Sequence, residues 1–138
     1  MTAEGTSSTL LDDEALAYLG RIGERVEFAQ GEIILRQGEM GSWFWVILHG
    51  EVDVLVQSKD NRESLFRLGP GETLGEVAIL RSAPVAADAV AITPVTALRY
   101  PGEYLPTALA ECESLRRTLL SRMAQNIHRS TSQALSLS

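Results

Sequence analysis

Residues 74–91 read LGEVAILRSAPVAADAVA and form the most informative segment of this chain. The segment opens with a glycine and a carboxylate, Gly75 and Glu76, and continues with small and apolar residues. Glycine allows other groups to approach the backbone closely and adopts turn conformations that other residues avoid. The apolar run behind it predicts a short helix over residues 77–80, opened by the glycine, with Glu76 at the junction.

Short apolar runs alternate with turn residues over residues 26–98. Glycines fall between or beside these runs, at Gly31, Gly38, Gly41, Gly50, Gly69, Gly71 and Gly75. Several short strands with such regular turn residues are typical of a β-sandwich or a barrel. We therefore expect a β-roll over this range, with turns at residues 59–61 and 69–72.

Helical patterns flank the predicted β-roll on both sides. Residues 9–23 predict a short helix whose first turn is capped by Thr9 or Asp12. Residues 102–130 predict two helices, a short one followed by a longer one. An apolar stripe repeats every four residues along the longer helix and consists of Leu115, Leu119, Met123 and Ile127.

One domain accounts for the whole chain. The sequence has 138 residues, of which 45% are hydrophobic, and this is enough for a single domain with its own core. We expect the domain to span residues 9–130. The small, polar segments at residues 1–8 and 131–138 are expected to be flexible.

Composition excludes several classes of protein. The net charge of −6 argues against nucleic-acid binding. A single cysteine, Cys112, excludes an internal disulfide. No apolar run approaches the ~18 residues of a membrane span, and the N-terminus lacks the basic and apolar regions of a signal peptide. We therefore expect a cytoplasmic protein that makes no membrane contact.

Three stretches together resemble the cyclic-nucleotide-binding domain family. Residues 28–54 are similar to the first signature of that family, including the spacing of its glycines. Residues 68–80 resemble the approach to the family's phosphate-binding cassette, and residues 86–100 resemble the strand that leaves it. The likeness extends over about residues 10–128. It implies a mainly β fold, a jelly-roll-like β-roll with flanking helices.

The resemblance also implies a ligand, cyclic AMP or cyclic GMP. In the family, a glycine permits close approach, backbone N–H groups face the phosphate, and a carboxylate accepts from the ribose hydroxyl. An arginine pairs with the cyclic phosphate. The residues at the matching positions are Gly75 for the glycine, Glu76 for the carboxylate, Val77 and Ala78 for the backbone donors, and Ala86 and Ala87 for the pocket floor.

The family's arginine is missing from this chain. Aligned without a gap from Gly75 onward, its position holds Val85, and a position that is commonly threonine holds Asp88. Loss of one partner of a desolvated charge pair costs about 2–5 kcal/mol, which weakens binding roughly 30-fold to a few thousandfold. Arg81 is the alternative phosphate partner, and its other interpretation is an exposed arginine of the cassette.

Structural interpretations stand beside the functional ones. Glu76 is either the ribose carboxylate or a residue that stabilises the start of the short helix. Val85 and the alanines after it can fill the interior of the β-roll. Trp43 and Trp45 share one face of a predicted strand, and we favour packing over stacking on a nucleotide base.

Catalysis and metal binding are not expected. The two histidines, His49 and His128, lie far apart and lack the clustered partners that a metal site needs. Cys112 has no histidine near it in the sequence, and no serine lies in a glycine elbow. We therefore predict that the chain is not an enzyme and carries no metal or cofactor.

Arginines are concentrated on the last predicted helix, at Arg116, Arg117, Arg122 and Arg129. We interpret them as a solvated face near the helix C-terminus and not as a nucleic-acid contact. Transcription factors of the family carry a helix-turn-helix after this helix. Because the sequence ends at Ser138, we expect no DNA binding by this chain alone.

The sequence thus predicts a regulatory or sensor module. In the family, a bound ligand draws the last helices over the pocket, and an attached effector domain or a partner protein reads that shift. The apolar stripe would then be a lid or a homodimer interface, or would pack on the β-roll. Two functions stay open: cyclic-nucleotide binding, weakened or lost at Val85, or a degenerate module for protein interaction, dimerisation or a less anionic ligand.

Overall fold

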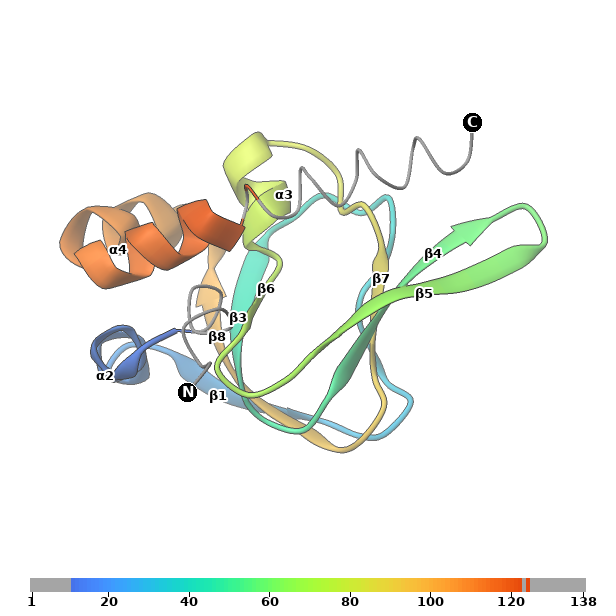
Figure 1. Cartoon of the computed structure of the whole chain (residues 1–138), viewed down its shortest axis with the longest axis horizontal. Helices are drawn as coiled ribbons and strands as arrows, with labels where there is room; N and C mark the ends of the chain where they lie inside the picture. Colours follow the sequence, from blue (N-terminus) through green and yellow to red (C-terminus); the bar gives the residue numbers. More distant parts are fainter. Residues whose placement is uncertain (1–10, 123, 125–138) are drawn as a thin grey trace, which may run out of the picture.

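Two four-stranded sheets and a set of helices make up the fold. The computed structural model describes residues 11–122 and residue 124, and Figure 1 shows the helix near its N-terminus and the helices after its last strand on one side of the strands. The elements in chain order are α2 (Asp13–Gly20), β1 (Glu24–Phe28), β2 (Ile33–Leu35), β3 (Trp43–His49), β4 (Val52–Ser58), β5 (Asn61–Leu68), β6 (Thr73–Leu74), α3 (Glu76–Arg81), β7 (Asp88–Ala91), β8 (Val95–Pro101), the 3-10 helix η1 (Gly102–Tyr104) and α4 (Leu105–Glu111).

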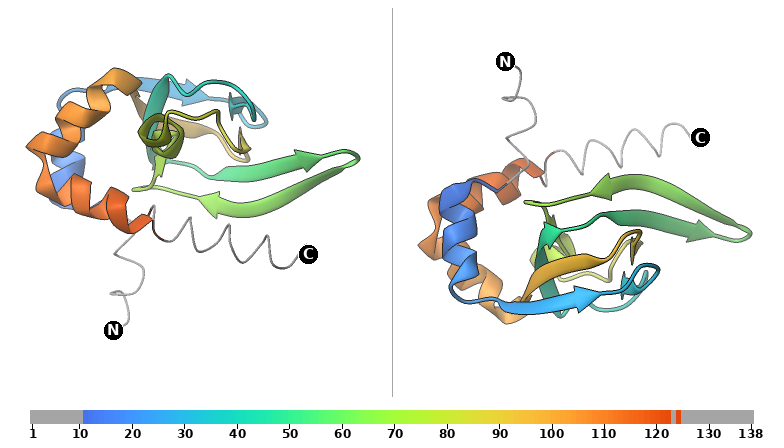
Figure 2. Two further views of the ribbon diagram at one scale, coloured as in Figure 1. Left: turned by 90° about the horizontal axis from the view of Figure 1, so that it is seen from above. Right: turned by 90° about the horizontal axis from the view of Figure 1, so that it is seen from below.

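The sheets have the strand orders β1-β8-β3-β6 and β2-β7-β4-β5, and every pairing is antiparallel. The predicted mainly β fold with flanking helices is therefore confirmed. The hairpin of β4 and β5 turns at residues 59–60, as expected, with Ser58 paired to Asn61. Figure 2 shows that this hairpin extends away from the helices.

Strand β3 divides the interior into two cores because its side chains alternate between two faces. Phe44 and Val46 belong to a core shared with the helices. Trp45 and Ile47 belong to a second core between the two sheets. Trp45 is 6% exposed, which confirms packing, whereas Trp43 lies at the surface with the guanidinium of Arg99 4.1 Å from its ring centroid.

The N-terminal helix is fixed at both ends. Asp12 caps it as predicted, and its Oδ1 accepts a hydrogen bond of 2.9 Å from the backbone N–H of Ala15. At the other end, the Tyr100 hydroxyl donates a buried hydrogen bond of 2.8 Å to the carbonyl of Leu19. The ring of Tyr100 also stacks on Phe44. Strand β8 is thereby joined to α2.

The chain returns to helix after β8 in two steps. α4 ends at Cys112, whose φ of −124° and ψ of 103° interrupt the helix. A further helix follows over residues 113–122 and is called the C-terminal helix below. No helix in the described part of the chain is long and apolar enough to span a membrane.

The apolar stripe of the C-terminal helix packs within the domain. Leu115 and Leu119 are 0% and 1% exposed and lie in the core shared by the helices and β3. Their burial fits the alternative in which the stripe packs within the domain. A role of this helix as a lid or as a dimer interface stays a prediction. Met123, Ile127 and the tails at residues 1–8 and 131–138 lie outside the described residues.

Candidate ligand-binding site

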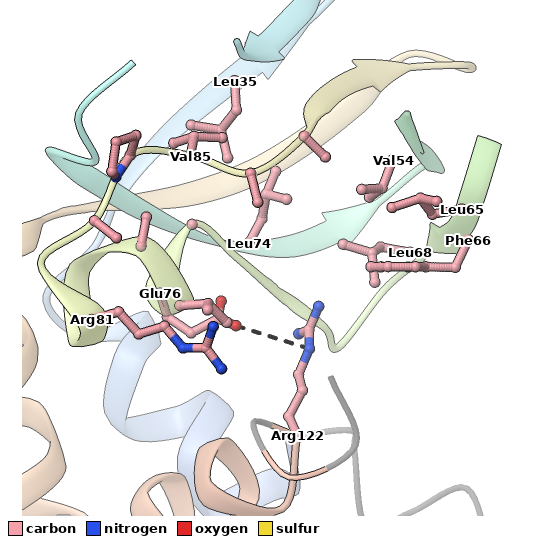
Figure 3. Close-up of a pocket in the computed structure, with 17 residues that line it drawn as sticks. Leu35, Val54, Leu65, Phe66, Leu68, Leu74, Glu76, Arg81, Val85 and Arg122 are labelled. Carbon is pink, nitrogen blue, oxygen red and sulfur yellow. Dashed lines mark ion pairs between the residues drawn. The ribbon is translucent and has the colours of Figure 1, made fainter. Parts of the chain in front are cut away.

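A cavity of about 340 Å³ lies between α3, the loop behind it and the strands β4 and β5. Figure 3 shows its lining side chains. All the ligand-binding residues predicted from the sequence line this one cavity: Gly75, Glu76, Val77, Ala78, Arg81, Val85, Ala86 and Ala87. The fold thus brings the whole predicted cassette to one place.

Gly75 makes the turn that positions the cassette. It is the N-cap of α3, with a φ of 93° and a ψ of −11°, a left-handed conformation that suits glycine. A Cβ atom at this position would lie 2.7 Å from the carbonyl oxygen of Trp43. Any larger residue would strain the backbone and displace β3, so the turn requires glycine. The predicted short helix is confirmed and runs from Glu76 to Arg81.

The carboxylate of Glu76 lies inside the protein at the first residue of α3. The residue is 2% exposed. Its Oε2 lies 3.9 Å from Nε of Arg122, whereas its Oε1 is buried without a hydrogen-bond partner among the described residues. The carboxylate is therefore directed at Arg122 and the pocket.

Arg122 reaches the pocket from the C-terminal helix. It is 7% exposed, and its Nη1 donates a hydrogen bond of 2.6 Å to Oγ1 of Thr73 on β6. Figure 3 marks its ion pair with Glu76. The expectation of a solvated arginine face is wrong for this residue, because the helix turns it toward β6 and α3. Arg116 and Arg117 are exposed, as expected.

The spacing of residues along the C-terminal helix gave one indication that Arg122 faces the domain interior. Arg122 follows Leu119 by three positions and Leu115 by seven, a spacing that places all three on one helix face. The sequence alone does not predict a buried position for Arg122, because arginine is rarely buried without a partner. The partners, Thr73 and Glu76, lie far away in the sequence.

Val85 forms part of the pocket wall where the family resemblance places an arginine. The residue is 7% exposed. Its backbone N–H donates to the carbonyl of Glu39 at 2.7 Å, and its carbonyl accepts from Gly38 at 2.8 Å. Figure 3 shows Val85 near Leu35, on the side of the pocket away from Arg122. This wall is therefore apolar.

Arg81, the alternative phosphate partner, and Asp88, at the position that is commonly threonine, lie in different surroundings. Arg81 is exposed on the last turn of α3, and Figure 3 shows its guanidinium on the Glu76 side of the pocket. The Asp88 carboxylate accepts from the backbone of Gln37 at 2.7 Å and pairs with Arg62 at 3.2 Å. Asp88 thus joins β7 to neighbouring segments of the β-roll.

The apolar part of the lining was not predicted as part of the site. It comes from four strands and consists of Leu35, Val54, Leu65, Phe66, Leu68 and Leu74. In the sequence these residues look like ordinary core positions of strands, and which of them line a cavity depends on how the two sheets pack. Among the described residues, no group of three or more His, Cys, Asp or Glu side chains is placed to hold a metal ion.

The comparisons with known proteins agree with this geometry. The family model for the cyclic nucleotide-binding domain matches residues 25–112. The chain belongs to this family. A CRP-like cAMP-activated global transcriptional regulator of Mycobacterium tuberculosis is 28% identical over 120 residues, which cover 86% of this chain and 54% of the regulator. The chain thus spans about half the length of that relative.

Solved structures of the same fold include two regulators. The catabolite activator protein of Thermus thermophilus matches with a TM-score of 0.78 at 24% identity, over 92% of this chain and 60% of that one. The regulatory subunit of a cAMP-independent protein kinase A from Trypanosoma brucei matches with a TM-score of 0.72 at 27% identity, over 96% and 50%. A triple mutant of that subunit, with one threonine replaced by arginine, is bound to cAMP.

The Mycobacterium tuberculosis relative is named a transcriptional regulator, and the Trypanosoma brucei protein is named a regulatory subunit. The present chain is accordingly a regulatory domain of the cyclic-nucleotide-binding type.

Proposed function

We propose that this chain is a sensor domain whose pocket binds cyclic AMP and cyclic GMP only weakly. The observation that carries the proposal is the buried Val85 on the pocket wall, where the sequence resemblance places the family's phosphate-binding arginine. A cyclic phosphate brought there leaves water and gains no cation in exchange. The missing pair costs about 2–5 kcal/mol, which converts a micromolar site into one near the millimolar range.

The comparisons support this assignment of Val85. The Trypanosoma brucei subunit carries the name cAMP-independent, and its cAMP-bound mutant has gained an arginine. Three substitutions, one of which adds an arginine, thus accompany the cAMP-bound form of a related domain.

The intact frame of the pocket favours ligand sensing over a degenerate interaction module. Gly75 keeps the left-handed turn that opens α3, and it holds the buried Glu76 at a cavity of about 340 Å³. The dimerisation alternative loses its main support, because Leu115 and Leu119 are buried within the domain. We propose no catalytic role for any residue of the pocket.

The proposed output runs through the C-terminal helix. Arg122 connects that helix directly to the pocket, so a ligand that changes the surroundings of Glu76 also acts on the helix. An effector domain or a partner protein would read the change. A homodimer through this helix stays a prediction, and Leu120, which is 61% exposed, is an apolar side chain that it could use. Location in the cytoplasm stays a prediction.

The test restores the missing cation. Val85→Arg is compared with Val85→Met, a control of similar length without charge, by calorimetric titration with cyclic AMP and cyclic GMP. We expect Val85→Arg to tighten binding of at least one of them tenfold or more, and Val85→Met to leave it unchanged. Equal affinity of both variants and the natural chain would show that residue 85 does not face the phosphate.

A further inference from the structure

An unpaired acceptor lies at the polar end of the pocket. Oε1 of Glu76 is buried without a hydrogen-bond partner among the described residues, in a residue that is 2% exposed. A carboxylate oxygen only accepts hydrogen bonds, and leaving a buried one unpaired is costly. This oxygen is therefore suited to a ligand that donates a hydrogen bond, such as a hydroxyl group.

The charge of Glu76 is cancelled by Arg122. The two side chains are 3% and 8% exposed, and they lie 3.9 Å apart at Oε2 and Nε. Arginine stays protonated inside proteins, and the hydrogen bond to Thr73 fixes its position. The polar end of the pocket is thus neutral as a whole, and it offers an anion no net attraction.

The rest of the pocket adds no buried cation. Apart from Glu76, Arg81 and Arg122, every residue that lines the cavity is uncharged and apolar. Arg81 is exposed, so solvent screens its charge. The volume of about 340 Å³ lies at the lower end of the ~300–1,000 Å³ range of small-molecule pockets. The cavity therefore suits a small molecule with an apolar or aromatic body.

The family to which the chain belongs is named for cyclic nucleotides, which combine a base, sugar hydroxyl and phosphate. This pocket keeps an acceptor for a hydroxyl and an apolar wall, and it lacks a cation for the phosphate. From this neutral polar end, we infer that the pocket takes an uncharged nucleoside in preference to the cyclic phosphate of the same nucleoside. Arg122 contributes to this preference by neutralising Glu76, beside the apolar wall at Val85. The inference rests on the proposed function, since it names the ligand of the same pocket.

The experiment measures a ratio of affinities on the full chain. Adenosine is titrated against cyclic AMP, and guanosine against cyclic GMP, at one ionic strength in a calorimeter. At least one nucleoside is expected to bind tenfold or more tightly than its cyclic phosphate. The 2′,3′-dideoxy form of that nucleoside, which lacks both ring hydroxyl donors, is expected to bind at least tenfold more weakly.

Two substitutions test the neutralisation itself. Glu76→Gln keeps the shape and leaves Arg122 as an uncompensated cation, so the affinity ratio is expected to move toward the cyclic phosphate by tenfold or more. Arg122→Met leaves the negative charge alone and is expected to move the ratio in the opposite direction. Because the effect is a ratio of two ligands, a general loss of affinity in either variant cancels. Circular dichroism verifies folding, and Glu76→Gln alone suffices if Arg122→Met does not fold.

The inference is overturned if the natural chain binds the cyclic phosphate as tightly as the nucleoside, or if neither nucleoside binds at millimolar concentration. It is also overturned if Glu76→Gln leaves the ratio unchanged. If neither nucleoside binds, a gain of cyclic-nucleotide binding in Val85→Arg still upholds the proposed function. Micromolar binding of a cyclic nucleotide by the natural chain would instead overturn the proposed function.

Discussion

Arg122 and Thr73 join the C-terminal helix to strand β6 through one buried hydrogen bond of 2.6 Å. The donor belongs to the helix that the sensor would move, and the acceptor lies three residues before the carboxylate at the pocket. The same arginine also pairs with Glu76. Ligand site and output helix therefore share a side chain, and no relay through the core is needed to couple them.

Removal of the Thr73 hydroxyl is expected to weaken this connection. Thr73→Val keeps the shape of the side chain and leaves a buried charged donor without its acceptor, at a cost of about 1.5–3 kcal/mol. At roughly 4 °C per kcal/mol, the thermal midpoint falls by about 6–12 °C. Thr73→Ser retains the hydroxyl and should lose much less. Equal midpoints for the valine and serine variants would contradict a stabilising hydrogen bond.

Gly75 is expected to tolerate no side chain. Gly75→Ala places a Cβ atom 2.7 Å from the Trp43 carbonyl at a φ of +93°, and the strained backbone alone costs about 1–3 kcal/mol. We expect a lower thermal midpoint together with loss of ligand binding, since α3 must move. Gly69→Ala is the matched control because a Cβ there has no atom within 4 Å. A Gly75→Ala variant as stable as this control would refute the close packing of the turn.

The hydroxyl of Tyr100 is expected to matter for stability while the ring keeps its stacking on Phe44. Tyr100→Phe removes the hydroxyl that donates to the Leu19 carbonyl. That carbonyl keeps the backbone hydrogen bonds from Ile22 and Gly23, so the expected loss is that of one ordinary hydrogen bond, about 0.5–1.5 kcal/mol. Urea unfolding monitored by tryptophan fluorescence measures the loss. An unchanged free energy of unfolding would show that the hydrogen bond adds nothing.

Tyr100 is also expected to make the free energy of unfolding depend on pH in the alkaline range. Burial raises the pKa of the Tyr100 phenol in the folded protein above its ordinary value of 10.0. As the pH rises past about 10, the unfolded chain loses this proton before the folded one does, so the free energy of unfolding declines. Below that pH the contribution is fully present. Tyr100→Phe should show a shallower decline between about pH 9 and 11, and parallel curves would contradict the assignment.

Arg81 is expected to have little part in phosphate binding. The residue is exposed, and screened surface charges contribute about 0–1 kcal/mol. In a Val85→Arg background, where cyclic-nucleotide affinity is measurable, Arg81→Ala should change that affinity less than about fivefold. A loss of a hundredfold would identify Arg81 as the substitute phosphate partner.

Local patterns predicted much of this protein. The glycine before Glu76, the cap at Asp12 and the alternation along β3 each depend on neighbours in the sequence, and each was read correctly. The buried position of Arg122 was missed because it depends on Thr73 and Glu76, more than forty residues earlier. The apolar pocket wall was missed for a related reason, since strand patterns show which residues are buried and not which of them border a cavity.

With Val85 on its wall, the pocket is expected to bind a cyclic phosphate only weakly. The most direct measurement is a calorimetric titration of the unmodified chain with cyclic AMP. We expect a dissociation constant of ~1 mM or weaker, because a loss of about 2–5 kcal/mol at a micromolar site gives that range. A dissociation constant in the micromolar range would contradict it, because the pocket would then bind the phosphate without the family's arginine.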